Sequence, residues 1–295
     1  MIAIVSHDAG GAEILSSFVR RNKGEYLYVL EGPALRIFES KLGKIDIRSF
    51  DFAMANARSV LTGTSWGSDL EYRAIKEARG RGIRSCTFLD HWVHYTERLE
   101  REGVTVLPDE IWVGDEYALR LAQEQFNSTD IKFVSNPYFA DIVEEIDRCH
   151  VPQSGEKTER ILYVCEPVGE HMKRQYGNER ALGYIEDDAI RFFFDNIGRI
   201  ADNPSRIVIR PHPAESREKY KWVLNAYALP VEIGGKRPLL DEIMDCDIVV
   251  GIQSMAMVVG LLAGKKVYSS IPPGGKPCAL PHVEIIKLKE VLHRG

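Results

Sequence analysis

Strict alternation between short β-rich runs and helix-like segments is the feature that most constrains this fold. In the first half, we expect strands at Ile2 to Ser6, Tyr26 to Leu30, Val60 to Thr62, Arg84 to Leu89, Glu110 to Val113 and Lys132 to Val134. Helical patterns separate these runs, as in Ala12 to Arg21 and Asp69 to Arg79. Alternation of this kind predicts βαβ units and a parallel, doubly wound sheet.

A second alternating series follows a polar stretch that has no periodicity. This stretch, Val151 to Arg160, contains Pro and Gly and is predicted to be a linker. The later strands are expected at Ile161 to Cys165, Arg206 to Arg210, Val231 to Ile233, Asp247 to Val250 and Lys266 to Ser269, with a last short element at Glu284 to Lys287. The helices between them include Asp187 to Ala201 and Glu215 to Ala226. A chain of 295 residues is long enough for two domains. We therefore expect an α/β protein of two Rossmann-like doubly wound lobes, residues 1–150 and 160–295, that face each other across a cleft.

Composition limits the classes of partner and the compartment. The net charge is -5, from 43 acidic and 38 basic residues without long blocks, which argues against a nucleic-acid partner. The five cysteines form no C-x-x-C pair and are expected to be reduced thiols of a cytoplasmic protein. The amino terminus predicts a first strand and no signal peptide. The most apolar stretch, Asp247 to Gly264, is broken by Gln253 and Ser254, so it predicts a strand, a turn and a buried helix.

Ligands of doubly wound sheets bind at the carboxyl ends of the strands, so candidate residues were sought there. The first strand is followed by SHDAGGAEI, in which Gly10 and Gly11 allow a tight turn and a close approach to a substrate. His7 and Asp8 are placed to take a proton from an incoming hydroxyl. The alternative is that Asp8 caps the following helix. The spacing is not G-x-G-x-x-G, which disfavours a nicotinamide enzyme, and no cofactor is expected.

The segment FLDHWVHYTER, Phe88 to Arg98, has an unusual density of polar and aromatic residues after a strand. Asp90 or His91 is a second candidate for the catalytic base, and Trp92 is a candidate for contact with a sugar or a nucleotide. The spacing of Asp90, His91 and His94 matches no established metal pattern, so no metal is expected. The alternative is a surface loop. Two further strand ends are TGTSWGSDLE, which fits either a ligand-facing loop or a structural cap at Ser68, and VSNPYFADI, which is chiefly structural.

The second half has two strand ends that suit an anion. In RIVIRPHPAES, Pro211 and Pro213 fix His212 at the end of a strand, where it and Arg210 can contact a phosphate. Further on, Gln253 and Ser254 begin a helix whose free N–H groups and serine hydroxyl suit a phosphate. Each motif alone also has a plain structural interpretation, namely a strand terminus and an ordinary helix cap.

Together, IRPHPAE and MDCDIVVGIQSMAMVVGLLAGKKVYSSIPP resemble the donor-binding lobe of GT-B glycosyltransferases and related proteins. These include bacterial sialyltransferases and polysialyltransferases with a His-Pro motif, CDP-glycerol glycerophosphotransferases and UDP-N-acetylglucosamine 2-epimerases. The resemblance is local, covering most of Ile207 to Pro273. It implies that His212 and Ser254 hold the donor's phosphate, and that Asp8 matches the family's acidic base, although the family loop is acidic-acidic-glycine.

The resemblance implies a metal-independent transfer of sugar from a nucleotide-linked donor to a hydroxyl of a glycan or lipid-linked acceptor, in bacterial surface polysaccharide or glycoconjugate synthesis. UDP-sugar members usually have a Glu after the serine turn, whereas this chain has Met255 to Val259, so a CMP- or CDP-linked donor is favoured. The alternatives are a nucleotide-sugar epimerase or hydrolase and a non-catalytic nucleotide or glycan-binding protein. A homodimer is possible on this interpretation, and membrane association is at most peripheral.

Overall fold

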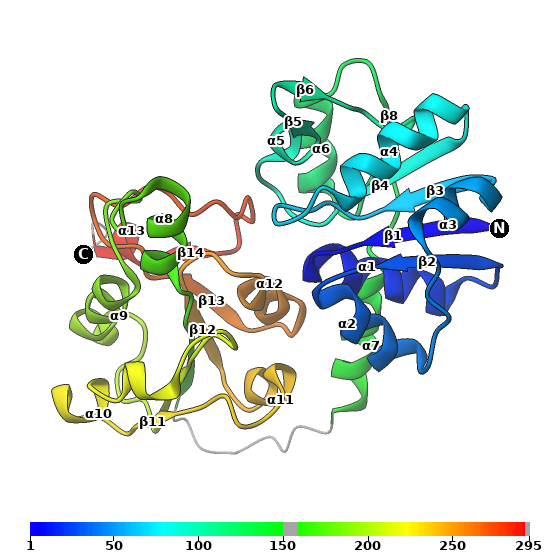
Figure 1. Ribbon diagram of the computed structural model, residues 1–295. Helices are drawn as coiled ribbons and strands as arrows, with labels where there is room; N and C mark the ends of the chain where they lie inside the picture. Colours follow the sequence, from blue (N-terminus) through cyan, green and yellow to red (C-terminus); the bar gives the residue numbers. More distant parts are fainter. Residues whose placement is uncertain (150–158, 293–295) are drawn as a thin grey trace. The chain divides into compact units, whose positions relative to one another are not determined.

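The computed structural model describes residues 1–149 and 159–292, and the chain divides by its contacts into two units, Met1–Asp141 and Ile142–Gly295. Each unit is built on a parallel six-stranded sheet with helices on its faces (Figure 1). This confirms the predicted α/β class with two doubly wound sheets. Most of the predicted linker, Val151 to Arg160, lies outside the described residues. The predicted cleft between the lobes stays a prediction.

The sheet of the first unit has the strand order β2-β1-β3-β4-β7-β8. Its strands are β1 (Ile2–Ser6), β2 (Tyr26–Leu30), β3 (Ser59–Thr62), β4 (Arg84–Leu89), β7 (Glu110–Val113) and β8 (Asp130–Phe133). The helices are α1 (Ala9–Arg21), α2 (Pro33–Leu42), α3 (Phe50–Asn56), α4 (Leu70–Arg81), α5 (Tyr95–Arg98), α6 (Glu116–Gln125) and α7 (Pro137–Arg148), and β5 (Glu100–Arg101) pairs with β6 (Val104–Thr105). The order reverses between β1 and β3, which is the position at which doubly wound sheets have the crevice that binds ligands.

Alternate residues of each central strand are buried on opposite faces of this sheet. Both faces are covered by helices, which explains why the strands are apolar throughout. Ile4 and Leu61 pack against α1 and α2, through residues such as Leu15 and Phe38. Their neighbours Ala3, Val5 and Val60 pack against α3 and α4 on the other face. The two helical layers fix the carboxyl ends of β1 and β3 side by side.

The sheet of the second unit has the order β11-β10-β9-β12-β13-β14, which is the Rossmann order. Its strands are β9 (Arg160–Val164), β10 (Arg206–Arg210), β11 (Val231–Ile233), β12 (Ile248–Gly251), β13 (Lys266–Ser269) and β14 (Ile286–Lys287). The helices are α8 (Val168–Tyr176), α9 (Glu186–Asp195), α10 (Val223–Ala226), α11 (Leu239–Met244), α12 (Met255–Leu262) and α13 (Leu288–Val291), with 3-10 turns η1 (Ile197–Arg199) and η2 (Arg217–Tyr220). Here the order reverses between β9 and β12.

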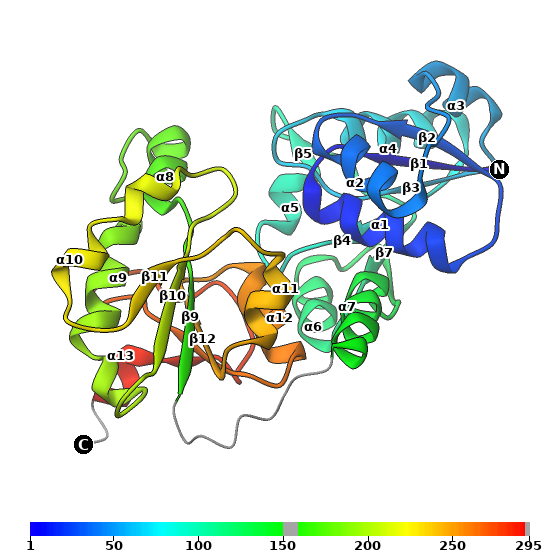
Figure 2. The same cartoon turned by 90° about the horizontal axis from the view of Figure 1, so that it is seen from below.

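Helices cover both faces of this second sheet as well (Figure 2). On one face, Tyr163 and Ile207 pack against Phe193 of α9, Val223 of α10 and Leu288 of α13. On the other face, α12 packs on β12 and β13, where Gly260 lies against Val249 and Val267. The predicted strand, turn and buried helix of Asp247 to Gly264 is confirmed by β12 and α12. No helix among residues 1–149 and 159–292 is long and apolar enough to span a membrane.

Several helices differ from the pattern in the sequence. The predicted helix Asp187 to Ala201 is divided into α9 and η1, and the predicted helix Glu215 to Ala226 is divided into η2 and α10. Helices α3 and α8 were not predicted. At α4 the residue that precedes the helix is Asp69, while the predicted cap Ser68 accepts a hydrogen bond from the N–H of Leu70 at 3.1 Å. All five cysteines are free thiols, as predicted.

Gly63 and Gly11 allow β3 and α1 to approach at the crevice of the first unit. A Cβ atom at Gly63 would lie 2.8 Å from Cα of Gly11, which belongs to the backbone and has no freedom to turn aside. We expect Gly63→Ala to destabilise the protein by about 1–3 kcal/mol, as overpacking does. Gly80→Ala in α4 is the control, because no described atom lies within 4 Å of the new methyl group, and it should stabilise by about 0.5 kcal/mol. Thermal unfolding of both variants measures the difference, and equal midpoints would contradict the packing argument.

Candidate functional site

His7 and Asp8 lie at the crevice of the first unit, directly after β1. Nδ1 of His7 and Oδ1 of Asp8 are 2.7 Å apart. The other carboxylate oxygen, Oδ2, accepts the N–H of Trp66 at 2.7 Å, so the loop after β3 is fastened to the loop after β1. The carboxyl group of Asp8 makes no hydrogen bond to α1 among the described residues. Asp8 therefore orients His7 and the Trp66 loop, and the interpretation of Asp8 as a side-chain cap of α1 is wrong.

These hydrogen bonds keep Asp8 ionised. Burial raises the pKa of Asp8, but the hydrogen bonds from Trp66, His7, Ser65 and Gly67 outweigh burial and hold that pKa below its ordinary value. A carboxylate held in this way is a weak proton acceptor, but it fixes the tautomer of an adjacent imidazole. With the proton on Nδ1 and donated to Asp8, His7 presents Nε2 as the basic nitrogen.

Gly32 leaves Nε2 of His7 uncovered. It lies before α2 with φ at 53°, a conformation that favours glycine, and a Cβ there would be 2.6 Å from Nε2. The side chain of His7 is 23% exposed, so part of the imidazole faces solvent. His7 thus has the features of a general base: a carboxylate on one nitrogen and an open position at the other.

Asp90, the second candidate for the base, is engaged by other groups. Its Oδ1 accepts the hydroxyl of Thr64 at 2.6 Å and contacts Nη1 of Arg98 at 3.2 Å, and its side chain is only 7% exposed. A Cβ at Gly10 would collide with the carboxylate of Asp90, so Gly10 is needed to make room for it. The carboxylate of Asp90 therefore lies at the start of α1, where it is enclosed and paired with Arg98.

The aromatic residues after β4 are divided between the core and the surface. Trp92 is 5% exposed and donates its indole N–H to Asp115 at 2.9 Å, which places it in the core of the first unit. Nδ1 of His91 accepts the N–H of Trp92 at 3.0 Å, and burial lowers the pKa of His91. The exposed aromatic residue in this region is Trp66, at 47%, with the ring of His94 5.1 Å from it. Trp92 was predicted to contact a sugar or a nucleotide, whereas Trp66 is the tryptophan whose backbone N–H binds Asp8.

Glu71, in the first turn of α4, was missed by the sequence analysis. It is 3% exposed, and its Oε1 accepts the N–H of His7 at 2.6 Å. Its Oε2 has no hydrogen-bond partner within the described part of the chain. Burial raises the pKa of Glu71 to about 7. An acidic residue in the first turn of a helix is common, so no sequence signal marked it.

The raised pKa of Glu71 predicts a pH-dependent stability. Because the folded protein holds this proton up to about pH 7 and the unfolded chain releases it near its ordinary pKa of 4.5, stability falls as pH rises between these values. Glu71→Gln removes this loss and should stabilise the protein by about 2–3 kcal/mol at pH 8, with little effect at pH 4. Chemical unfolding at both pH values tests this, with the exposed Glu77→Gln of the same helix as a control. An equal change at both pH values would contradict it.

In the second unit, Glu166 lies at the reversal of the strand order, directly after β9. Its Oε1 accepts the N–H groups of Gln253 at 2.7 Å and Ile252 at 3.2 Å, and a hydrogen bond with the backbone of Ser254 adds to these. Burial raises the pKa of Glu166 to about 7 in spite of these bonds. Glu166 is partly exposed. The sequence analysis missed this carboxylate, although a Glu directly after a buried strand was a usable signal.

Ser254 and Gln253 lie where they were predicted, at the start of α12. The hydroxyl oxygen of Ser254 is enclosed and has no hydrogen-bond partner among the described residues. Oε1 of Gln253 accepts the N–H of Ala279 at 3.2 Å, so its side chain ties segment 278–280 to the start of the helix. The backbone N–H of Gln253 is occupied by Glu166, which the sequence did not indicate.

His212 follows β10, the strand on the other side of β9. Its Nδ1 accepts the N–H of Ala214 at 3.2 Å, which leaves the hydrogen on Nε2. Burial lowers the pKa of His212 and outweighs the opposite effect of Glu215, so the ring is neutral at pH 7. Strands β10 and β12 flank β9, so their ends are about 10 Å apart.

Arg210 has a different role from the predicted one. Its Nη1 donates to the carboxylate of Glu242 at 2.7 Å and to the carbonyl of Arg237 at 2.9 Å. The side chains of Arg210 and Glu242 are 15% and 8% exposed. This ion pair neutralises the charge that the sequence analysis assigned to a phosphate, and it fastens α11 to the end of β10.

A charged cluster lies beside His212 and is rich in carboxylates. Glu215, with a side chain 2% exposed, accepts from Lys219 at 2.6 Å and from the hydroxyl of Tyr220 at 2.9 Å. Lys219 also pairs with Glu186, which accepts the N–H of Gly169 at 2.8 Å. Glu215 is close enough to Glu166 to raise its pKa. One ammonium group thus serves two carboxylates, and Glu166 is a third anion nearby.

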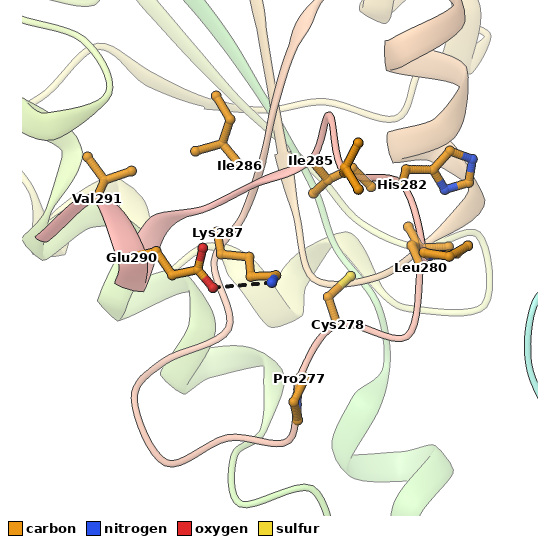
Figure 3. A pocket seen from close by; sticks show the side chains of 11 residues that line it. Pro277, Cys278, Leu280, His282, Ile285, Ile286, Lys287, Glu290 and Val291 are labelled. Carbon is orange, nitrogen blue, oxygen red and sulfur yellow. Dashed lines mark ion pairs between the residues drawn. The ribbon is translucent and has the colours of Figure 1, made fainter. Parts of the chain in front are cut away.

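A pocket of about 530 Å³ lies at the edge of the second sheet, beside β14 (Figure 3). Leu280, Ile285 and Val291 give it apolar walls, and Lys287 pairs with Glu290 at 3.2 Å. Its lining includes Cys278 but none of the residues selected from the sequence. Within residues 1–149 and 159–292, no three His, Cys, Asp or Glu residues group as metal ligands.

Comparison with solved structures identifies the architecture. The UDP-GlcNAc 2-epimerase from Methanocaldococcus jannaschii matches with a TM-score of 0.57 and 10% identity, over 99% of this chain and 91% of that chain. The Neisseria meningitidis UDP-GlcNAc 2-epimerase, bound to UDP-GlcNAc, gives 0.56 and 12%, over 99% and 90%. The glycotransferase of kitacinnamycin gives 0.51 and 14%, over 91% and 79%.

The chain has the GT-B fold. No family model matches its sequence, and no curated protein matches it at a significant level. At 10–14% identity the likeness shows the fold alone, so the function of this GT-B protein must be argued from its own side chains.

Proposed function

We propose that this protein is a glycosyltransferase that moves a sugar from a nucleotide-linked donor to a hydroxyl group of a glycan or lipid-linked acceptor. The observation that carries the proposal is the pair of strand ends in the second unit. A neutral His212 with an N–H to donate and the unpartnered hydroxyl of Ser254 extend from the two strands that flank β9. In a Rossmann sheet, this reversal point is where the phosphates of a nucleotide bind.

On the donor side, the first step is departure of the nucleotide. The bond between the anomeric carbon of the sugar and the phosphate oxygen breaks, and negative charge develops on the phosphate. Nε2–H of His212, the hydroxyl of Ser254 and the first N–H groups of α12 donate to that charge. We keep the inference that a CMP- or CDP-linked donor is favoured over UDP, which rests on the absence of a Glu in Met255 to Val259. No step of this proposal uses a metal ion.

On the acceptor side, the proposal assigns the base to His7. Nε2 of His7 takes the proton of the acceptor hydroxyl as its oxygen bonds to the anomeric carbon, and the carboxylate of Asp8 stabilises the imidazolium. Trp66, whose backbone N–H binds Asp8, is 47% exposed and has an aromatic ring of the kind that sugars stack on. The ion pair of Asp90 and Arg98 fixes the loops after β3 and β4. Gly10 and Gly11 allow α1 to pack closely against these loops.

A second candidate is a nucleotide-sugar epimerase or hydrolase. It is favoured by the likeness to the two UDP-GlcNAc 2-epimerases, which covers 99% of this chain in both cases. Such an enzyme needs no acceptor. The five free thiols are consistent with the cytoplasm as the compartment of either enzyme.

Nucleotide binding and turnover separate these candidates. A thermal-shift series with CMP, CDP, UDP and GDP identifies the nucleotide, since binding to the folded state raises the melting temperature. The matching nucleotide-sugar is then incubated with and without a panel of glycan acceptors, and nucleotide release is measured. We expect release to depend on an acceptor. Rapid turnover of a UDP-sugar alone would establish the second candidate, and failure of all four nucleotides to bind would exclude both.

A further inference from the structure

The start of α12 already holds an anion that belongs to the protein itself. Oε1 of Glu166 accepts two backbone N–H groups there, from Ile252 and Gln253. The hydroxyl of Ser254 lies next to them in the chain and is left without a partner in the described residues. The donor phosphate would bind this hydroxyl and the first N–H groups of α12, which follow in the chain, so the phosphate and the carboxylate of Glu166 would occupy neighbouring positions.

The surroundings of Glu166 do not compensate a second anion. Among the groups that act on it or respond to it electrostatically, Glu215 is an anion, and Tyr163, Tyr184, Cys165 and Cys278 are neutral hydroxyl and thiol groups. Lys219 is committed to Glu186 and Glu215. His212 is held as a neutral donor by Ala214. A phosphate that arrives here meets an excess of negative charge.

We propose that Glu166 takes up a proton when the phosphate of the donor binds, and that its neutral carboxyl group then donates a hydrogen bond to that phosphate. This inference rests on the proposed function. It makes Glu166 a phosphate-site residue. The proton comes from solvent, and no bond other than O–H is formed.

The physical reason is that two anions in one partly enclosed site repel each other strongly. A phosphate about 5 Å from a carboxylate in protein surroundings shifts the proton equilibrium of the carboxyl group by about a hundredfold. Free Glu166, with a pKa raised by burial to about 7, is mostly ionised at pH 8. In the complex it is mostly protonated, so binding at pH 8 should take up about 0.8 proton.

Titration calorimetry of the nucleotide that binds, CMP or CDP, tests the inference. Binding to the whole protein is measured at pH 8 in HEPES and in Tris, and the difference in enthalpy gives the number of protons taken up. We expect about 0.8 proton for the native protein and a roughly 25-fold loss of affinity from pH 7 to pH 9. Glu166→Gln should bind more tightly than the native protein at pH 9, without this proton or this loss. Glu170→Gln, at an exposed position of α8, is the control and should behave as the native protein.

Each other outcome contradicts the inference in a recognisable way. Tight binding by the native protein without proton uptake would overturn the inference and leave the proposed function standing. Uptake that persists in Glu166→Gln but disappears in His212→Gln would assign the proton to the imidazole instead. Weaker binding by Glu166→Gln at pH 9 would show that the ionised carboxylate is needed. Failure of every nucleotide to bind the native protein would refute the proposed function itself.

Discussion

Replacement of His212 by Ala should reduce the turnover of the nucleotide-sugar by about 100- to 1,000-fold. In the proposed function the imidazole of His212 donates toward the developing phosphate charge, and loss of one such donor in an enclosed site has an effect of this size. Because Nε2–H contributes more to the transition state than to the bound substrate, kcat should fall more than KM rises. Steady-state kinetics of nucleotide release measures both constants.

The control for His212→Ala is His282→Ala, a histidine of the second unit that lines the pocket beside β14. It should retain the native rate. Unfolding experiments on both variants show whether the fold is preserved, and we expect His212→Ala to change stability by less than about 1 kcal/mol, because its imidazole accepts from a single exposed N–H, that of Ala214. Native turnover by His212→Ala would remove this residue from the site.

Replacement of His7 by Ala should have the second large effect, a loss of about 100- to 10,000-fold in transfer to the acceptor. Nucleotide binding should be unchanged, because the nucleotide is assigned to the second unit. Asp8→Asn should lose a similar amount, since an amide no longer holds the proton on Nδ1 of His7. Transfer kinetics under saturating donor separates this acceptor-side defect from a donor-side defect.

The control for Asp8→Asn is Asp46→Asn, an exposed aspartate of the first unit with a side chain 71% exposed, which should be as active as the native protein. If His7→Ala remained active while Asp90→Asn or His91→Ala did not, the base would be in the loop after β4. That outcome would assign the catalytic base to Asp90 or His91, the second candidates predicted from the sequence.

Much of the fold followed from the sequence because apolar runs and turn residues are local signals. The strands of both sheets and the β12–α12 turn were predictable from such runs alone. Helices α3 and α8 were not predicted, since they are short and contacts distant in sequence stabilise them. The helix predicted at Glu215 to Ala226 is broken because Glu215 and Tyr220 serve a buried hydrogen-bond network instead of helical periodicity.

The site was predictable only in its positions. Strand ends located His7, Asp8, His212 and Ser254, but hydrogen bonds that shape both sites join residues far apart in the chain. Asp8 accepts a hydrogen bond from the N–H of Trp66, which is 58 residues away in the sequence. Glu166 accepts one from the N–H of Gln253, which is 87 residues away. Burial, and with it the ionisation of Glu71 and Glu166, also depends on such distant neighbours.

The glycines of the first unit bear on how related sequences are to be judged. Gly10, Gly11 and Gly63 are required by close packing against Asp90 and against each other, so an inactive descendant of this protein would have to retain them as well. Gly32 has a further role, because a side chain at this position would cover one nitrogen of His7. In a genome survey, joint presence of His7 and Gly32 would be the better marker of a working enzyme, and SHDAGG alone would mark only the fold.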